Sequence, residues 1–315
     1  MGKNTLLKKR SVKKKQRIAK IIVSLIRYGF LIAFSYILIY PIIFMISHTF
    51  KNPIDFMDPT IEWVPKAFSV EPILSALKVM LMPDSLWNTV WIEVFASVLT
   101  IISTGIAAYG MACFDFKFKK VLNVLLVLMI LVPPSMLLIP NYINFHSFDI
   151  LGILDVLGDI TGYELRPNFL NTAFAVYLPA ITSVGIKAGF CIFIYQQFYK
   201  GIPKELHEAA WIDGASELQT YVRVIVPSSG VAVLTVSLLS VIWHWNDYFN
   251  AQMFMSAHPT MAMRLNDFFV NSRDISAAAD AAMAACLMFI LPMLILYMIL
   301  QKRFITSIAS TGIVG

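Results

Sequence analysis

The sequence predicts an all-α polytopic membrane protein with six transmembrane helices. Of its 315 residues, 58% are hydrophobic and only 14% are charged, and the mean hydropathy is +0.72. A soluble domain carries about 25% charged and roughly 45–50% apolar residues. The apolar excess falls in runs near the ~20 residues that a helix needs to cross a bilayer. Because backbone groups in lipid must be paired within the chain, these runs are expected to be helices.

The six apolar runs divide the chain into an arm, a transmembrane domain and a tail. The basic arm covers residues 1–20, the six-helix domain 21–301 and the tail 302–315. Prolines within or beside four of the runs are expected to kink them. The runs themselves cover residues 21–46, 87–113, 121–144, 171–198, 229–251 and 280–301.

The distribution of Lys and Arg predicts the orientation. Residues 3–20 carry nine basic side chains and no acid, directly before the first run. With this end inside, the inner segments hold 17 Lys and Arg against six in the outer ones, which is the usual bias of cytoplasmic loops. Both termini and the polar segment 201–227 are therefore expected in the cytoplasm. A nucleic-acid partner is not expected, because the basic stretch leads straight into an apolar run.

The residue patterns exclude several kinds of chemistry. Cys113, Cys191 and Cys286 have no C-x-x-C or Cys/His spacing, so free thiols are expected and no metal site. The chain contains no G-x-x-x-x-G-K-[ST] segment and therefore no phosphate-binding loop. Its histidines form no pair at helical spacing. The chain is expected not to be an enzyme and to bind no cofactor of its own.

The polar segment 201–227 predicts two helices joined by a sharp turn. The first, 204–212, is expected to end at Gly214, since glycine takes the left-handed conformation at little steric cost. Ser216 followed by Gln219 is a capping-box pattern that starts a second helix. That helix is expected to run to about residue 226. A helix lying on the membrane surface is one interpretation of this segment, but its alanine pair and glycine turn favour contact with another protein.

The same segment resembles a known motif. Residues 202–227, IPKELHEAAWIDGASELQTYVRVIVP, resemble the EAA loop of ABC importer permeases, in the carbohydrate branch where the motif runs ELxEAAxIDGA. FCIFIYQQFYKGIP before the loop and WHWNDYFNAQMF after it are also similar to that branch. The resemblance covers about residues 87–305 and is to the maltose-type second permease. It implies the ABC type I importer permease fold, in the cytoplasmic membrane of a prokaryote.

The resemblance also implies partners. They are a second homologous permease subunit in a heterodimer, two ATP-binding subunits that hold ATP and Mg, and an extracytoplasmic solute-binding protein that delivers a carbohydrate. The family's coupling helix fits a cleft of the ATPase, and its tail reaches between the ATPase subunits. Carried onto this sequence, the ATPase-coupling residues are Leu206, Glu208, Ala209, Ala210, Ile212, Asp213 and Gly214.

Candidate substrate-path residues lie in and near the runs. Aromatic faces and side-chain amides match the C–H faces and hydroxyls of sugars, although Trp and Tyr also form interfacial belts. Charges within apolar runs usually face a water-filled path or each other, so a Glu93–Lys187 ion pair is a further possibility. The candidates are Trp243, Trp245, Asn246, Asp247, Tyr248, Asn250, Glu93 and Lys187.

Other functions stay open from the sequence. An ion-gradient-driven secondary transporter often contains internal repeats, and none is visible between 21–144 and 171–301. A sensor or assembly scaffold is another class. Within importers, a phosphorylated polyol or another small non-sugar solute competes with carbohydrate. Retention of an ATPase subunit in a pull-down separates an importer from the other two classes.

Overall fold

The computed structural model describes residues 3–52, 55, 63–149, 151–271 and 275–311. Within these residues it contains helices, one isolated antiparallel bridge between Lys51 and Phe68, and no strand. The all-α prediction is confirmed. The described helices are α1 (Lys3–Thr49), α3 (Glu71–Val79), α4 (Asp84–Thr89), η1 (Val90–Val94), α5 (Phe95–Cys113), α6 (Lys119–Leu131), α7 (Pro134–His146), α8 (Ile153–Thr161), α9 (Phe174–Ile181), α10 (Ala188–Lys200), α11 (Lys204–Ile212), α12 (Glu217–Thr220), η2 (Tyr221–Ile225), α13 (Val226–Ser228), α14 (Gly230–Trp245), α15 (Phe249–Phe254), α16 (Met261–Asn271) and α17 (Ile275–Thr311).

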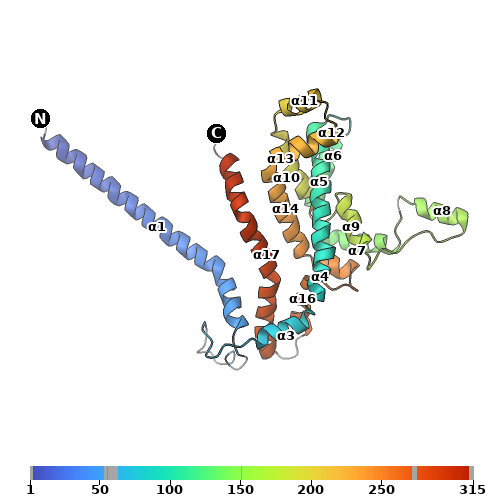
Figure 1. Cartoon of the computed structure of the whole chain (residues 1–315), viewed down its shortest axis with the longest axis horizontal. Helices are drawn as coiled ribbons and strands as arrows, with labels where there is room; N and C mark the ends of the chain where they lie inside the picture. Colours follow the sequence, from blue (N-terminus) through green and yellow to red (C-terminus); the bar gives the residue numbers. More distant parts are fainter. Residues whose placement is uncertain (1–2, 53–54, 56–62, 150, 272–274, 312–315) are drawn as a thin grey trace. The chain divides into compact units, whose positions relative to one another are not determined.

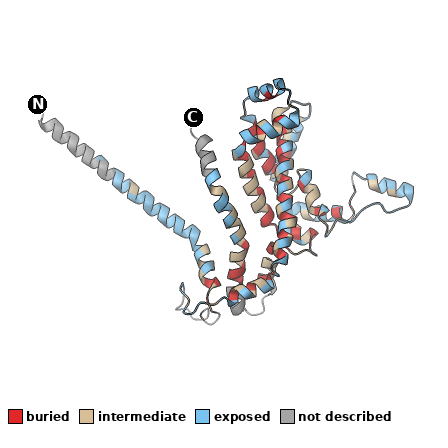
Figure 2. Cartoon of the chain, in the orientation of Figure 1, coloured by how far each residue is buried: buried red, intermediate tan, exposed pale blue. Residues whose placement is uncertain are grey.

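The described residues fall into two compact units. The first comprises residues up to 75 together with 275–287, and the second comprises 76–271 together with 288–311. In the first unit, α1 runs without interruption from the basic arm into the first apolar run. Most apolar side chains of its described part are exposed (Figure 2), as expected of a helix surface that meets lipid.

In the second unit, α5 is the central helix. It packs against α9, α10 and α14 (Figure 1). Small residues allow the close approach: a β-carbon at Gly105 would lie 2.5 Å from the hydroxyl oxygen of Tyr221. Tyr195 and Tyr199 of α10 are almost fully buried beside α5, with Ile225 and Val236 in the same cluster. One of the buried clusters of this unit therefore forms around α5.

The candidate membrane spans are fewer than the six expected helices. Lys20–Thr49, Asp84–Cys113 and Ala281–Arg303 are each long and apolar enough to cross a bilayer. Two bent pairs also qualify if each counts as one span: α6 with α7, bent by 102°, and Glu217–Ser228 with α14, bent by 86°. The described residues thus give three to five spans by length and composition.

Two expected spans are interrupted for identifiable reasons. The run 121–144 breaks at Val132 and Pro133, which are both extended, because a residue that precedes proline is disfavoured in the helical conformation. The run 171–198 is divided into α9 and α10 by residues 182–187. Ser183 and Lys187 both have positive φ there. A straight helix is therefore excluded at both places.

The predicted orientation can be tested by cysteine labelling. Val156 of α8 and Leu218 of α12 are exposed at 58% and 66%, and they lie in segments assigned to opposite sides of the membrane. In a background lacking the three native cysteines, a membrane-impermeant maleimide added to intact cells should label Val156→Cys and not Leu218→Cys. Permeabilised cells, in which both positions should react, provide the control. Labelling of position 218 in intact cells would contradict the orientation.

Candidate functional site

The corner at 201–227 forms largely as its sequence predicts. The first helix, α11, has the predicted bounds. Gly214 has a φ of +75°, in the left-handed region that glycine tolerates best. The capping box is present: the Ser216 hydroxyl accepts from the Gln219 N–H at 3.3 Å, and the Gln219 side-chain oxygen accepts from the Ser216 N–H at 3.0 Å. The predicted turn between two helices is confirmed.

The second helix of the corner continues slightly beyond its expected end. It passes from α12 through the π-helical segment η2 into α13 and ends at Ser228. Pro227 lies in the first turn of α13. Because proline has no N–H, it cannot donate to the carbonyl one α-helical turn before it, and the wider turn of η2 lies at that point. The helical path therefore continues through Pro227.

The two faces of α11 differ in exposure. Leu206 is 42% and Ile212 is 86% exposed, and Glu208, Ala209, Asp213 and Gly214 are exposed with them. Ala210 is only 8% exposed, so it packs against its own chain. Six of the seven candidate coupling residues are thus on the surface. Trp211, 50% exposed beside them, was not singled out from the sequence.

The buried face of α11 is attached to the end of α5. His207 is 9% exposed, and its ring stacks on Tyr109 at 5.8 Å between centroids, with 9° between the ring planes. The His207 Nε2 atom lies 3.6 Å from the Cys113 thiol. The Tyr109 hydroxyl donates to a Glu217 carboxylate oxygen at 3.1 Å. Both helices of the corner therefore contact α5 through side chains that the sequence analysis missed.

Glu93 and Lys187, which the sequence left open as an ion pair, have other neighbours in the structure. Glu93 is buried on η1, a segment that packs against α14, and one carboxylate oxygen lies 3.2 Å from His244 Nδ1. His244 Nε2 lies 3.4 Å from the Thr100 hydroxyl. The Lys187 ammonium instead lies 5.7 Å from the centroid of the Phe190 ring. The partner of Glu93 is thus an imidazole on α14.

The aromatic element near the end of α14 separates into packing residues and surface residues. Trp245 is 3% exposed and donates from its indole N–H to the Phe289 carbonyl at 3.0 Å. Trp243 packs against Phe190, with 6.1 Å between centroids. The Tyr248 hydroxyl accepts from Asn266, and Asn246 is exposed. Trp245 and Tyr248 thus have structural partners within the chain.

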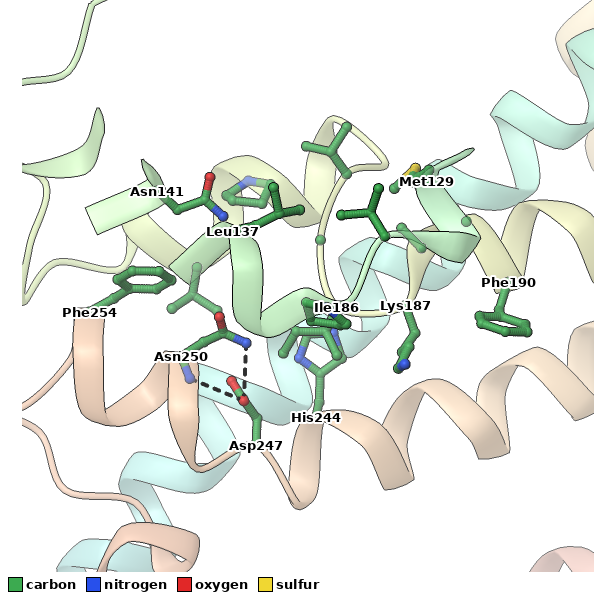
Figure 3. Close-up of a pocket in the computed structure, with 18 of the residues that line it drawn as sticks. Met129, Leu137, Asn141, Ile186, Lys187, Phe190, His244, Asp247, Asn250 and Phe254 are labelled. Carbon is green, nitrogen blue, oxygen red and sulfur yellow. Dashed lines mark hydrogen bonds between the residues drawn. The ribbon is translucent and has the colours of Figure 1, made fainter. Parts of the chain in front are cut away.

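Three further candidates for the substrate path line a cavity of about 140 Å³. Figure 3 shows Lys187, Asp247 and Asn250 around it, with His244 and Asn141. One Asp247 oxygen accepts from the Asn250 backbone N–H at 3.3 Å and from its side-chain amide at 3.1 Å. Among the described residues, no three His, Cys, Asp or Glu side chains are grouped so that they could hold a metal ion.

Comparison with protein families gives one match. The family described as "Binding-protein-dependent transport system inner membrane component" matches residues 101–310, about two thirds of the chain. The match includes α11, the corner and all the cavity-lining residues.

Curated relatives cover most of the chain. The melibiose/raffinose/stachyose import permease protein MelC of Bacillus subtilis is 29% identical over 271 residues, which are 82% of this chain and 86% of that protein. The arabinooligosaccharides transport system permease protein AraQ of Halalkalibacterium halodurans is 26% identical over 235 residues, 72% of this chain and 73% of that protein.

A solved structure shares the fold. It is a chain of a bacterial ABC transporter involved in the import of the acidic polysaccharide alginate, with a TM-score of 0.71 and 22% sequence identity. The alignment covers 91% of this chain and 98% of that chain. The expected ABC importer permease fold is therefore confirmed.

The attachment of the corner to α5 predicts a local effect of Tyr109→Phe. Losing the bond to Glu217 should cost about 0.5–1.5 kcal/mol, which corresponds to a roughly 2- to 12-fold rise in the open population of the corner. Trypsin cleavage after Lys204 of the purified protein in detergent should accelerate by that factor, because cleavage tracks the open population. Tyr163→Phe, at a 74% exposed tyrosine, is the matched control. Equal cleavage rates for Tyr109→Phe and wild type would contradict the role of this bond.

Proposed function

Because the chain belongs to the family of binding-protein-dependent transport system inner membrane components, we propose that it is the permease subunit of an ATP-driven ABC importer of carbohydrate. The proposal rests on one observation: the short helix α11 has one exposed face and one face attached to the central helix α5. The relatives named for oligosaccharide transport support the substrate class. The proposed location is the cytoplasmic membrane of a prokaryote, with both termini in the cytoplasm.

The exposed face of α11 is proposed to dock on an ATP-binding subunit. Burial of an apolar side chain such as Leu206 or Ile212 contributes about 1.5–3 kcal/mol relative to exposure. Glu208 and Asp213 add two carboxylates suited to basic groups of that partner. Because the exposed side chain of Ala209 is small, the backbone of α11 can approach the ATP-binding subunit closely. ATP and Mg are proposed to bind in the partner, because this sequence has no phosphate-binding loop of its own.

The attached face of α11 is proposed to transmit the movement. Stacking of His207 on Tyr109 joins α11 to α5, and the bond from Tyr109 to Glu217 joins α12 to the same helix. A displacement of the corner therefore acts on α5, around which α9, α10 and α14 pack. Closure of the ATPase would in this way reorient the helices that surround the transport path.

The other partners are proposed from the family and from exposed surfaces. Helix α8 has no buried residue, and Ile160 and Tyr163 beside its end are both 74% exposed. In the predicted orientation α8 faces outward, which suits contact with a solute-binding protein that delivers the sugar. A second homologous permease subunit and a second ATP-binding subunit complete the proposed assembly. The tail, helical as far as Thr311, is proposed to reach the ATPase side.

Charge reversal at Glu208 tests the docking face. In the assembled transporter, Glu208→Lys should lower ATP hydrolysis stimulated by the binding protein at least tenfold, because an unpaired charge at such an interface costs about 2–5 kcal/mol. Its abundance in the membrane should stay normal, since a surface substitution changes stability by about 0.5 kcal/mol or less. Asp115→Lys, at an exposed carboxylate outside α11, is the control and should hydrolyse ATP at the wild-type rate. Wild-type sugar uptake by Glu208→Lys at normal abundance would refute this role.

A further inference from the structure

Three interruptions of helical geometry meet at the cavity described above. They are the break between α6 and α7, the residues 182–187 between α9 and α10, and the residues 246–248 between α14 and α15. Irregular backbone at membrane depth is tolerated where it is covered by protein or lines a water-filled cavity. In secondary transporters, which are a different class of transport protein, discontinuous helices also surround the bound substrate. The convergence of three breaks on one space indicates a binding site.

Lys187 occupies an unfavourable position on one wall of the cavity. Its φ is +53°, a conformation that side chains with a β-carbon rarely adopt. It also precedes the first residue of α10, where the helix dipole disfavours a cation. Backbone strain and unfavourable charge placement concentrate at functional positions. The ammonium group is therefore a candidate ligand contact.

Asp247 presents an unsatisfied acceptor on another wall. The residue is 9% exposed. One carboxylate oxygen is engaged by Asn250, while Oδ2 has no hydrogen-bond partner within the described part of the chain. Buried polar atoms without a partner are uncommon and call for an explanation. A hydroxyl group donated by a ligand would satisfy Oδ2, and Asn141 offers a further side-chain amide on the same cavity.

The size and lining of the cavity select the ligand. This cavity has about 140 Å³, and since a cavity of ~150 Å³ holds the six carbons of benzene, it admits one ring at most. Phe145, Phe190 and Phe254 supply apolar surface, while Lys187 and Asp247 supply opposite charges. A sugar ring combines C–H faces with a rim of hydroxyls and carries no net charge. An acidic ring would place a second carboxyl group beside that of Asp247, so a neutral ring fits better than an acidic one.

We propose that this cavity binds one neutral sugar ring of the transported carbohydrate, with hydroxyls held by the Lys187 ammonium and by Asp247 Oδ2. The inference rests on the proposed function and adds to it that this subunit contacts the sugar itself. In this proposal the main contacts of the sugar are Lys187 and Asp247. The aromatic side chains near the end of α14 are not the main contacts, since Trp245 and Tyr248 already have partners within the chain.

Retention of sugar in the arrested transporter tests the proposal. The complete assembly, reconstituted with its ATP-binding subunits and binding protein, is first assayed for import of radiolabelled raffinose, maltotriose, arabinotriose and trigalacturonate. It is then arrested with vanadate, and the retained sugar and the trapped nucleotide are both counted. Asp247→Asn keeps the acceptor for Asn250 and replaces Oδ2, and Lys187→Met removes the ammonium. Each should reduce retained sugar at least tenfold with trapped nucleotide unchanged.

Matched variants separate binding from folding. Val184 lines the cavity and is 62% exposed, so Val184→Trp should fill the space without disturbing the core and should also abolish retention. Asp115→Asn and Lys120→Met make the same chemical changes away from the cavity and should retain sugar as wild type does.

Three outcomes separate the proposed carbohydrate function from the proposed sugar site. Import of no sugar by the wild type would reject the proposed carbohydrate function, and this site with it. Import with full retention by Asp247→Asn, Lys187→Met and Val184→Trp would overturn the site and leave the function standing. Import of trigalacturonate alone, with retention dependent on Lys187 and not on Asp247, would overturn the choice of a neutral ring.

Discussion

A chain within a bilayer finds no water for its backbone groups, and this constraint determines where the molecule keeps or leaves helical geometry. The central helix α5 is continuous, and α10 and α14 pack closely along it. Three departures from helix line one cavity. In the polar corner at 201–227, the turn between α11 and α12 is largely exposed, so water can satisfy its backbone groups. A substrate path and a docking element are thus both consistent with the same requirement.

In the proposed coupling, the two faces of α11 have different roles. A helix buried on all sides would offer nothing to a partner, and a helix exposed on all sides would move without affecting the core. In α11, His207 and Ala210 pack inward, while Leu206 and Ile212 remain exposed. The contacts of Tyr109 with both α11 and α12 make α5 the recipient of any displacement. The same α5 unit supports the helices whose breaks surround the cavity.

The features that were predicted correctly from the sequence are those that neighbouring residues determine. The bounds of α11, the left-handed Gly214 and the Ser216–Gln219 capping box depend on residues within one turn of each other, so short patterns were sufficient. Pairings such as Glu93 with His244 and Tyr109 with Glu217 join residues 151 and 108 positions apart, and no local pattern encodes them. The runs 121–144 and 171–198 were expected to be kinked helices, and each is divided into two separate helices, because apolar composition alone does not distinguish a continuous helix from two short ones. The burial of Trp245 could not be predicted for a related reason, since composition does not distinguish a core aromatic from an exposed one.

In the proposed mechanism, the exposed face of α11 contacts an ATP-binding subunit while the opposite face stays on α5. Photo-crosslinking tests it directly, with benzoylphenylalanine placed at Ile212 in the assembled transporter and, for comparison, at the exposed apolar residue Leu125 of α6. We expect an adduct with the ATP-binding subunit from position 212 and none from position 125. Absence of that adduct from position 212, in an assembly that contains the subunit and hydrolyses ATP, would contradict it.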